Sequence, residues 1–406
     1  LVDNLQRTGE SGQECGPGGT LTEAGRGGSS VAATVRQVHT YLAADPALRK
    51  RYARAKALRR VARYANNYDI TSRCNLFCEG CFYFEGDDYK RAREETDLAK
   101  WQMLYKSEAE RGVTFANFVG AEPSLEPERI AAAQKYFKRG VVFSNGTVKI
   151  DPAIAYTVLI SVWGDEKTTT VLRGGSVLHK ALSNYRGDPR ARALFTVSAK
   201  NIDQIAAVTR IVADYGIPLS YNYFSPTDSY LRKLKGGVSD PSRSFRLSSA
   251  DDNMILSADD LKRIRDRIDD MIDLYPGQVF HSHAFNAFVT NPDGIYAIDP
   301  ATGLAKNCSG MHSPWHQTHR VDLCLSDGKC CAPNTNCRHC RLSSISLASF
   351  MFRLDDFLAS RADFVSWLDI CDQWGRGHLL DADAIFAGDL QAAPVAETGT
   401  ALRRVG

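Results

Sequence analysis

Three cysteines stand close together in the stretch ITSRCNLFCEGCFYFEG, which covers residues 70–86. Cys74, Cys78 and Cys81 follow the spacing CxxxCxxC, and no fourth cysteine lies near them. A [4Fe-4S] cluster normally takes four thiolates, so three from one loop leave one iron with an open coordination position. An open position also separates catalytic from structural zinc sites. The spacing therefore indicates a cluster that takes part in chemistry, and a zinc knuckle or chance clustering is the alternative.

The elements around this stretch indicate how it is positioned. Between about residues 68 and 226, short apolar runs alternate with amphipathic helical stretches. The strand candidates are NYDIT, TFANFVG, GVVFSNGT, YTVLISVWG, ARALFTVSA and IPLSYNYFSP. This alternation predicts a parallel sheet covered by helices, and six repeats predict a partial or full barrel. The cysteine loop follows the first strand, at the edge where such folds bind ligands.

Cysteines with this spacing in this place resemble the signature of the radical S-adenosylmethionine superfamily. The resemblance implies an α/β fold, a partial (βα)6 TIM-like barrel with a small C-terminal cysteine-rich domain. It implies that Cys74, Cys78 and Cys81 hold a [4Fe-4S] cluster whose open iron binds S-adenosylmethionine. It also implies reductive cleavage of that cofactor to a 5′-deoxyadenosyl radical, which abstracts a hydrogen atom from the substrate.

Residues after the second strand resemble a further motif of that family. Gly120, Ala121 and Glu122 in VGAEP match the GGEP motif, whose backbone and acidic residue meet the methionine ammonium group. Ala121 replaces the second glycine, and a small residue still permits close approach of the backbone. The motif is therefore expected to bind S-adenosylmethionine.

Other cofactor contacts are expected around the same edge. Many family members carry an adenine-contacting aromatic residue just before the third cysteine, where this chain has Gly80, and Phe82 or Tyr83 is expected to replace it. The remaining expected contacts are Asn145, Ser161, Asp165, Arg173, Ser198 and Asn222. An ordinary turn for Asn145, a solvated loop for Ser161 and Asp165, and a surface charge for Arg173 are the alternatives.

A second group of cysteines falls in residues 308–340. Its members are Cys308, Cys324, Cys330, Cys331, Cys337 and Cys340. A helix beginning after Ser257 and a β-hairpin in AFVTNPDGIYAID are expected before it. The arrangement resembles the SPASM domain of the superfamily and its shorter form, twitch.

The spacing within this second group leaves the ligands open. Cys308, Cys324, Cys337 and Cys340 would close one auxiliary [4Fe-4S] cluster, and Cys330 or Cys331 would replace one of them or join a second cluster. A full SPASM domain usually needs seven cysteines, and only Cys371 remains downstream. A zinc ribbon that uses some of these cysteines, or nearby His312, His316, His319 or His339, is the alternative.

The rest of the chain divides by composition. The expected parts are a flexible tail (1–30), an N-terminal helical cap (31–67), the radical S-adenosylmethionine partial barrel (68–256), an auxiliary-cluster domain (257–345), and C-terminal helices with a tail (346–406).

Composition narrows the class of partner. The chain has 406 residues, of which 44% are hydrophobic and 24% charged, and a formal charge of +3. A nearly neutral protein has no strong electrostatic footprint for nucleic acid or an anionic membrane. We find no long apolar run for a membrane span, and the opening residues lack the apolar core of a signal peptide. A cytoplasmic, reducing location is expected, where clustered cysteines serve as metal ligands or catalytic groups.

The resemblance implies an oxidoreductase or C–H modifying enzyme of natural-product biosynthesis. The substrate expected first is a sugar-like or aminocyclitol-like small molecule, because residues 31–67 look purely helical and lack the winged-helix element of many peptide maturases. Ribosomal-peptide crosslinking or epimerisation is the alternative, and a non-catalytic metal-cluster protein that binds RNA is an alternative of another class. An electron donor such as flavodoxin or ferredoxin is the expected protein partner.

Overall fold

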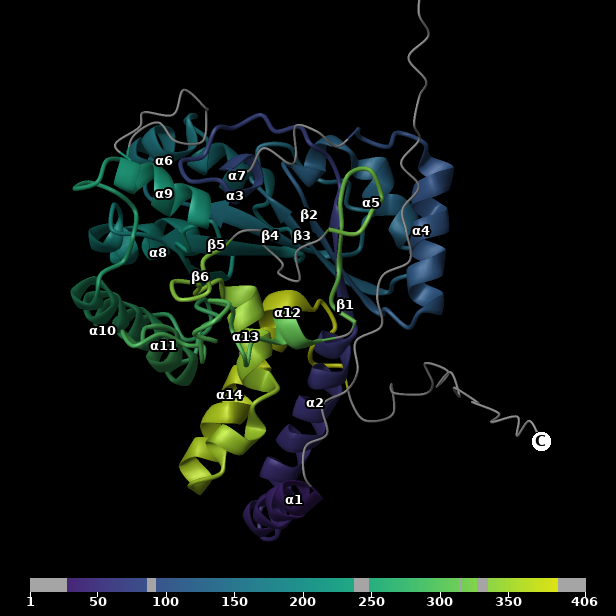
Figure 1. Cartoon of the computed structure of the whole chain (residues 1–406), viewed down its shortest axis with the longest axis vertical. Coiled ribbons are helices and arrows are strands. Elements are labelled where there is room, and N and C mark those ends of the chain that lie inside the picture. The colour runs from purple at the N-terminus through teal and green to yellow at the C-terminus, as the bar shows by residue number, and fades with distance from the viewer. Residues whose placement is uncertain (1–27, 86–92, 237–247, 314, 327–334, 386–406) are drawn as a thin grey trace, which may run out of the picture.

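The computed structural model describes residues 28–85, 93–236, 248–313, 315–326 and 335–385. At its centre lies a seven-stranded parallel sheet in the order β6-β5-β4-β3-β2-β1-β7 (Figure 1). The strands are β1 (Ala65–Asp69), β2 (Phe115–Val119), β3 (Arg139–Ser144), β4 (Thr157–Val162), β5 (Ala191–Val197), β6 (Leu219–Tyr223) and β7 (Thr318–His319). The six predicted strands and the α/β fold class are confirmed.

The seventh strand was not predicted. β7 comes from the cysteine-rich segment and pairs in parallel with β1, so that Tyr68 lies opposite His319. β6 and β7 are the two edges of the described sheet, and they do not pair with each other. The sheet is therefore an open, partial barrel, as the sequence predicted.

Helices connect successive strands and cover the sheet. They are α3 (Phe82–Glu85), α4 (Leu98–Glu110), η2 (Pro123–Leu125), α5 (Pro127–Ala133), α6 (Glu166–Arg173), α7 (Leu178–Asn184), η3 (Ile202–Gln204), α8 (Ile205–Asp214) and α9 (Asp228–Gly236). α4 shows why they form: Asp97 accepts a hydrogen bond from the Ala99 N–H at its start, and Trp101 and Tyr105, four residues apart, are fully buried. Parallel strands need such crossover helices because their ends lie far apart.

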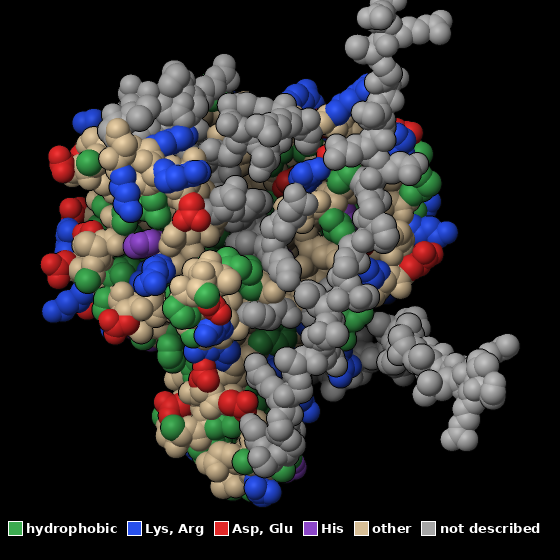
Figure 2. All heavy atoms as spheres, viewed as in Figure 1, with side chains coloured by type: hydrophobic (Ala, Val, Ile, Leu, Met, Phe, Trp, Pro, Cys, Tyr) green, Lys and Arg blue, Asp and Glu red, His purple; other side chains and the backbone are tan. Residues whose placement is uncertain are grey.

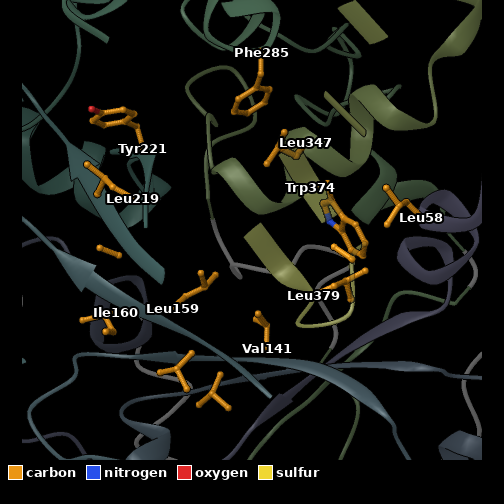
Figure 3. Close-up of a cluster of buried hydrophobic side chains, with 14 of the residues drawn as sticks. Leu58, Val141, Leu159, Ile160, Leu219, Tyr221, Phe285, Leu347, Trp374 and Leu379 are labelled. Carbon is orange, nitrogen blue, oxygen red and sulfur yellow. The ribbon is translucent and has the colours of Figure 1, made fainter. Parts of the chain in front are cut away.

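The terminal helices close the other side of the sheet. α2 (Pro46–Arg63), α13 (Ser343–Met351) and α14 (Arg361–His378) lie below it in Figure 1. Figure 3 shows Leu347 of α13 and Trp374 of α14 among buried side chains that include Val141 and Leu159 of the sheet. α1 (Gly28–Leu42) packs on α2, and η4 (Leu354–Phe357) joins α13 to α14. Helices therefore lie both before β1 and after β7 in the described chain.

α2 is more than a solvated cap. Its Ala57 and Leu58 are fully buried. Its Arg51 pairs with Asp369 and Asp372 of α14, at 2.7 and 2.8 Å between nitrogen and oxygen. Packing and ion pairing therefore tie the start of the described chain to its end.

One predicted element is wrong. The expected β-hairpin in AFVTNPDGIYAID (residues 287–299) is absent from the described residues, because α11 (His283–Val289) includes the first three residues of its expected first strand. Ser282 caps this helix by accepting a hydrogen bond from the Phe285 N–H, and the fully buried Phe285 and Val289 stand four residues apart. A capped helix with one buried face overrides the turn signal. The preceding α10 (Ala258–Leu274), with Ser257 as its cap, is confirmed, and α12 (Ser309–His312) follows Cys308.

Charged side chains are mixed over the surface. Figure 2 shows Lys and Arg interspersed with Asp and Glu on the face in view, without a large patch of one sign. No helix among the described ranges is both long enough and apolar enough to cross a membrane.

Candidate active site

The cysteine loop is fixed by backbone hydrogen bonds to the end of α6. The N–H of Phe77 donates to the Arg173 carbonyl at 3.0 Å, and the N–H of Glu79 donates to the Leu172 carbonyl at 2.7 Å. The last carbonyls of a helix have no partner within the helix, so they are available to hold a neighbouring loop. The chain order therefore places Cys78, which stands between these two donors, against the end of α6.

A carboxylate anchors the other end of the loop. Glu94 accepts hydrogen bonds from the Ser72 N–H at 3.0 Å, the Ser72 hydroxyl at 2.7 Å and the Thr71 hydroxyl at 3.0 Å. Arg129 of α5 donates to Glu94 at 2.7 Å and to the Ile70 carbonyl at 2.5 Å. Burial alone would raise the pKa of Glu94, but the bonds from Ser72, Arg129 and Thr71 lower the pKa to about 2.

The three thiols of the loop line one cavity of about 300 Å³. Burial raises the pKa of Cys74 to about 11 and that of Cys81 to about 12, and Cys78 adds to both shifts because it lies near them. These two thiols are therefore protonated at neutral pH, and a metal has to displace their protons on binding.

No three His, Cys, Asp or Glu side chains within the described ranges meet at a point that could hold one metal ion. The fit of Cys74, Cys78 and Cys81 to an iron-sulfur cluster rests on their residue type and on the cavity that all three line, since such clusters are held by Cys thiolates.

The GAEP turn lies directly across the end of β1. Gly120 has a φ of +117°, and a Cβ atom there would lie 2.9 Å from the Ile70 nitrogen. The Ala121 N–H donates to the Thr71 carbonyl at 2.9 Å. A side chain at residue 120 would therefore be strained and would collide with the strand, which explains why glycine stands there.

Glu122 holds the turn after β3. Its carboxylate accepts from the Ser144 hydroxyl at 2.7 Å, the Asn145 N–H at 2.7 Å and the Ser124 N–H at 3.1 Å. Asn145 in turn donates to the Asn75 side chain at 2.8 Å and lies 4.0 Å from the Cys74 sulfur. Glu122 and Asn145 both line the cavity and connect two strand ends to the cysteine loop.

Arg173 is not a surface charge. It is buried, lines the cavity, and donates from Nη1 to the Ser161 carbonyl at 2.5 Å. Its Nε lies 3.4 Å from the Cys78 sulfur. A buried guanidinium beside a thiol stabilises the thiolate that a metal requires.

The other predicted contacts divide into two groups. Tyr83, Gly120, Ala121, Ser161 and Asn222 line the cavity, whereas Asp165 and Ser198 do not. Asp165 caps α6 by accepting from the Thr168 N–H at 2.8 Å, and the Ser198 N–H donates to Asn201 at 2.8 Å. Both residues have local structural partners. Phe82 begins α3, and its side chain lies outside what the structure describes.

Several cavity residues were not found from the sequence. Asn67 and Asn117 face the cavity from neighbouring strands, with Asn117 donating to Asn67 at 3.0 Å. Asn67 lies 3.4 Å from the His316 ring, and burial lowers the pKa of His316 to about 4. A polar residue alternating with apolar ones along a strand was the available signal.

The second cysteine group gathers beside the same cavity. Cys308 and Cys340 are buried in one cluster with Cys337 packed against it, and all three are in the thiol form. Ser309 and Gly310, which follow Cys308, line the cavity. The auxiliary thiols are therefore separated from the cavity by little more than this short segment.

The remaining cysteines differ from that group. Cys324 is disulfide-bonded, and Cys330 and Cys331 lie outside the described residues. Cys371 is fully buried on α14, and burial raises its pKa well above the usual value. Cys371 packs in the hydrophobic core and therefore does not complete a set of seven ligands.

Two histidines of the zinc alternative, His316 and His319, have other contacts in the structure, whereas His339 is exposed beside Cys340. His319 is buried, stacks on Tyr68 with ring centres 5.5 Å apart, and lies 3.5 Å from Glu108. His316 faces the cavity rather than the second cysteine group. The side chain of His312 lies outside what is described.

Comparisons with known proteins bear on the fold alone. No protein-family model matches the chain, and no curated protein does. SuiB of Streptococcus suis is 14% identical over 64% of this chain and 58% of its own, with a TM-score of 0.44. The enzyme anSMEcpe with bound AdoMet is 14% identical over 65% of this chain and 74% of its own, with a TM-score of 0.42. The structure of anSMEcpe with bound AdoMet and the Cp18Cys peptide is 15% identical over 70% of this chain and 79% of its own, with a TM-score of 0.39.

Proposed function

We propose that this chain is a radical S-adenosylmethionine enzyme. One observation carries the proposal: a three-thiol loop follows β1 at the carboxyl edge of an open parallel sheet and faces a cavity. The rim of that cavity also carries the GAEP turn and the buried Arg173. Cavities at this edge are where α/β sheets bind ligands.

In this proposal Cys74, Cys78 and Cys81 hold a [4Fe-4S] cluster, and the turn at Gly120–Glu122 receives the amino-acid end of S-adenosylmethionine. When bound and reduced, this cluster would supply the electron for cleavage of S-adenosylmethionine to methionine and a 5′-deoxyadenosyl radical, the species that would abstract a hydrogen atom from the substrate. Arg173 stabilises the Cys78 thiolate, from which its Nε lies 3.4 Å away. The cavity walls orient the C–H bond and exclude water.

The second cysteine group is proposed to hold an auxiliary [4Fe-4S] cluster of the twitch or SPASM kind. Cys308, Cys337 and Cys340 would supply three thiolates, and a fourth would come from Cys330 or Cys331, or from Cys324 after reduction of the disulfide in which the structure places it. Such a cluster would accept the electron left on the substrate and make the reaction a net oxidation. The proposed auxiliary-cluster domain covers residues 257–345, as expected from the sequence. Its strand β7 pairs with β1 and joins this domain to the sheet.

A peptide replaces the aminocyclitol as the substrate proposed first. Glu122 is the only carboxylate among the described residues that line the cavity, and its oxygens already accept from Ser124, Ser144 and Asn145. Glu122 is proposed to meet the ammonium group of S-adenosylmethionine, so the ammonium group of an aminocyclitol would find no second carboxylate on the described wall. A peptide has a neutral backbone that amide and hydroxyl side chains can bind.

The RNA-binding alternative depends on the basic residues of α2. Arg51 and Arg54 pair with Asp369, Asp372 and Asp383, whereas Lys50, Lys56, Arg60 and Arg63 are exposed. A reducing partner such as flavodoxin or ferredoxin, and a cytoplasmic location, remain proposals that accompany the enzyme.

The test is iron content and S-adenosylmethionine cleavage after anaerobic reconstitution with reductant. The native chain is expected to bind about eight irons, and a Cys74→Ala, Cys78→Ala, Cys81→Ala variant about four. 5′-Deoxyadenosine should form with the native chain and not with the triple variant. Cys371→Ala is the matched control, because its thiol belongs to neither group, and it should keep both the iron and the activity.

Two results would contradict the proposal. One is a triple variant that keeps all its metal. The other is a native chain that holds zinc and forms no 5′-deoxyadenosine. Retention of RNA that weakens with salt would then favour the binding alternative.

A further inference from the structure

The cavity continues well below the cysteine rim. Ala65 and Phe115 are paired at the amino ends of β1 and β2, Asn67 and Asn117 are paired two residues further on, and all four line the cavity. Val119, at the rim, stands four positions after Phe115, and four positions correspond to roughly 13 Å along a strand. The lower end of the cavity is therefore far from the turn proposed to meet the cofactor.

Apolar side chains line a chamber that extends from the base of the cavity up one wall. Phe115 lies at its base, with Trp374 of α14 at 5.6 Å between ring centres, and both line the cavity. Further apolar lining residues are Ile345, Ala348 and Phe352 at α13, together with Phe143 and Leu194, which stand higher on β3 and β5. We refer to this set of seven residues as the apolar chamber.

Most polar groups beside the chamber are uncharged, and Arg63, two residues before Ala65, is the charged lining residue at this end of the described cavity. Asn67 and Asn117 lie above the base on β1 and β2, and Thr196 and Asn222 lie near the carboxyl ends of β5 and β6. Burial lowers the pKa of His378 to about 4, so this imidazole, which stacks on Trp374 at 5.2 Å, is neutral at pH 7. A mostly uncharged wall with an apolar end suits a ligand of the same character.

Small residues on α13 keep the chamber open. Ser344 and Ala348 line the cavity one helical turn apart, and Ala348 stands between the larger Ile345 and Phe352 along the chain. Phe143, Leu194 and Phe352 line the cavity and are only half-buried, so apolar surface remains uncovered on the inner wall. Apolar surface that is left uncovered inside a protein is stabilised when a ligand covers it.

We propose that the apolar chamber receives a bulky apolar side chain of the peptide substrate. The neutral Asn and Thr side chains beside the apolar chamber would bind the peptide backbone on either side of that apolar residue. The inference rests on the proposed function, since it names the residue that this enzyme would bring beneath its cofactor. A polyhydroxylated ring would instead leave its hydroxyl groups against Phe115, Trp374 and Leu194 without partners.

The test is binding of capped amino acids to the reconstituted protein with S-adenosylmethionine, measured by calorimetry. N-acetyl-phenylalaninamide is the probe, N-acetyl-glycinamide lacks only the side chain, and scyllo-inositol represents the cyclitols. We expect the phenylalanine probe to bind at least about tenfold more tightly than either of the others.

Ala348→Phe is designed to fill the chamber, and it should weaken binding of the phenylalanine probe at least about tenfold. Ala131→Phe on the exposed face of α5 is the matched control and should bind as the native chain does. Thermal unfolding checks that each variant folds. If Ala348→Phe does not fold, Ala348→Leu replaces it.

5′-Deoxyadenosine formation, measured on the same samples, separates the two proposals. Three results would contradict the apolar chamber alone if 5′-deoxyadenosine still forms. The chain binds scyllo-inositol better than the phenylalanine probe, or it binds none of the probes, or Ala348→Phe binds the phenylalanine probe as tightly as the native chain. Selective binding of the phenylalanine probe without 5′-deoxyadenosine contradicts the proposed reaction and leaves the chamber as a binding site.

Discussion

At the scale of single residues, Arg173 is the side chain that most directly connects the cavity wall to the cysteine loop. Its guanidinium reaches both the Ser161 carbonyl and the Cys78 sulfur from the last residue of α6. The sequence left it open as a surface charge, since a lone arginine on a helix is usually exposed. Burial beside a thiol makes its positive charge important for the loop.

Arg173→Met should slow 5′-deoxyadenosine formation at least about tenfold, because a hydrogen bond to a charged group contributes roughly 1.5–3 kcal/mol. It should also lower the midpoint potential of the cluster, since a nearby positive charge favours the reduced form. Arg173→Lys should restore much of the potential. Arg210→Met on the exposed face of α8 is the control. A potential unchanged in Arg173→Met would contradict the electrostatic role.

Gly120→Ala should destabilise the protein more than Gly187→Ala. Both residues have positive φ, +117° and +72°, so both substitutions bring backbone strain, on the order of 1–3 kcal/mol. Only the added Cβ of residue 120 meets the backbone, 2.9 Å from the Ile70 nitrogen, whereas nothing lies within 4 Å at residue 187. Urea unfolding of both variants measures the difference, and equal losses would show that the close approach is relieved at little cost.

At the scale of elements, the cysteine loop is positioned from both sides. α6 accepts the N–H groups of Phe77 and Glu79, and Glu94 with Arg129 of α5 holds the residues just after β1. A loop held at both ends keeps its three thiols in place before any metal binds, which reduces the entropy cost of binding.

Glu94→Gln should remove a pH-dependent part of the stability. The pKa of Glu94 is about 2 in the folded chain and 4.5 ordinarily, so its stabilisation is complete above about pH 4.5 and is lost as the pH falls towards 2. The gap in unfolding free energy between native and variant chains should therefore be widest near pH 6 and narrow towards pH 3. Glu128→Gln, at an exposed position of α5, is the control. A gap that does not change with pH would contradict this assignment.

At the scale of the whole molecule, the two ends of the described chain complete one fold. α2 packs on α14 through Leu58 and the Arg51 ion pairs, and α14 contributes Trp374 to the cavity. The cavity is therefore assembled from the sheet, the second cysteine segment and the C-terminal helices together. Ligand binding should stabilise the whole chain rather than one part of it.

S-adenosylmethionine should raise the melting temperature of the reconstituted native chain. At a concentration of 100 times the dissociation constant, binding adds about 2.7 kcal/mol, on the order of 3 °C for a chain of this size. The Cys74→Ala, Cys78→Ala, Cys81→Ala variant lacks the proposed open iron and should show a much smaller shift. Equal shifts in differential scanning fluorimetry would place the ligand somewhere other than this cluster.

The sequence by itself determined the features that depend on local periodicity and spacing. The six principal strands, the helices between them and the position of Cys74, Cys78 and Cys81 after β1 follow from alternation and motif spacing. Such patterns are readable because neighbouring residues along the chain repeat every two or 3.6 positions. The AFVTNPDGIYAID prediction failed where a capped helix and a turn competed for the same residues.

Only the tertiary structure decided which distant residues meet. It buried Arg173 beside Cys78, left Asp165 as a helix cap, brought Glu94 to Ser72, and placed Ala348 and Trp374 against the strands. These contacts depend on how α13, α14 and the cysteine-rich segment pack on the sheet, and no local pattern encodes that packing because the partners lie far apart in sequence. The chemistry expected at the rim was therefore readable in the sequence, whereas the shape offered to a substrate was not.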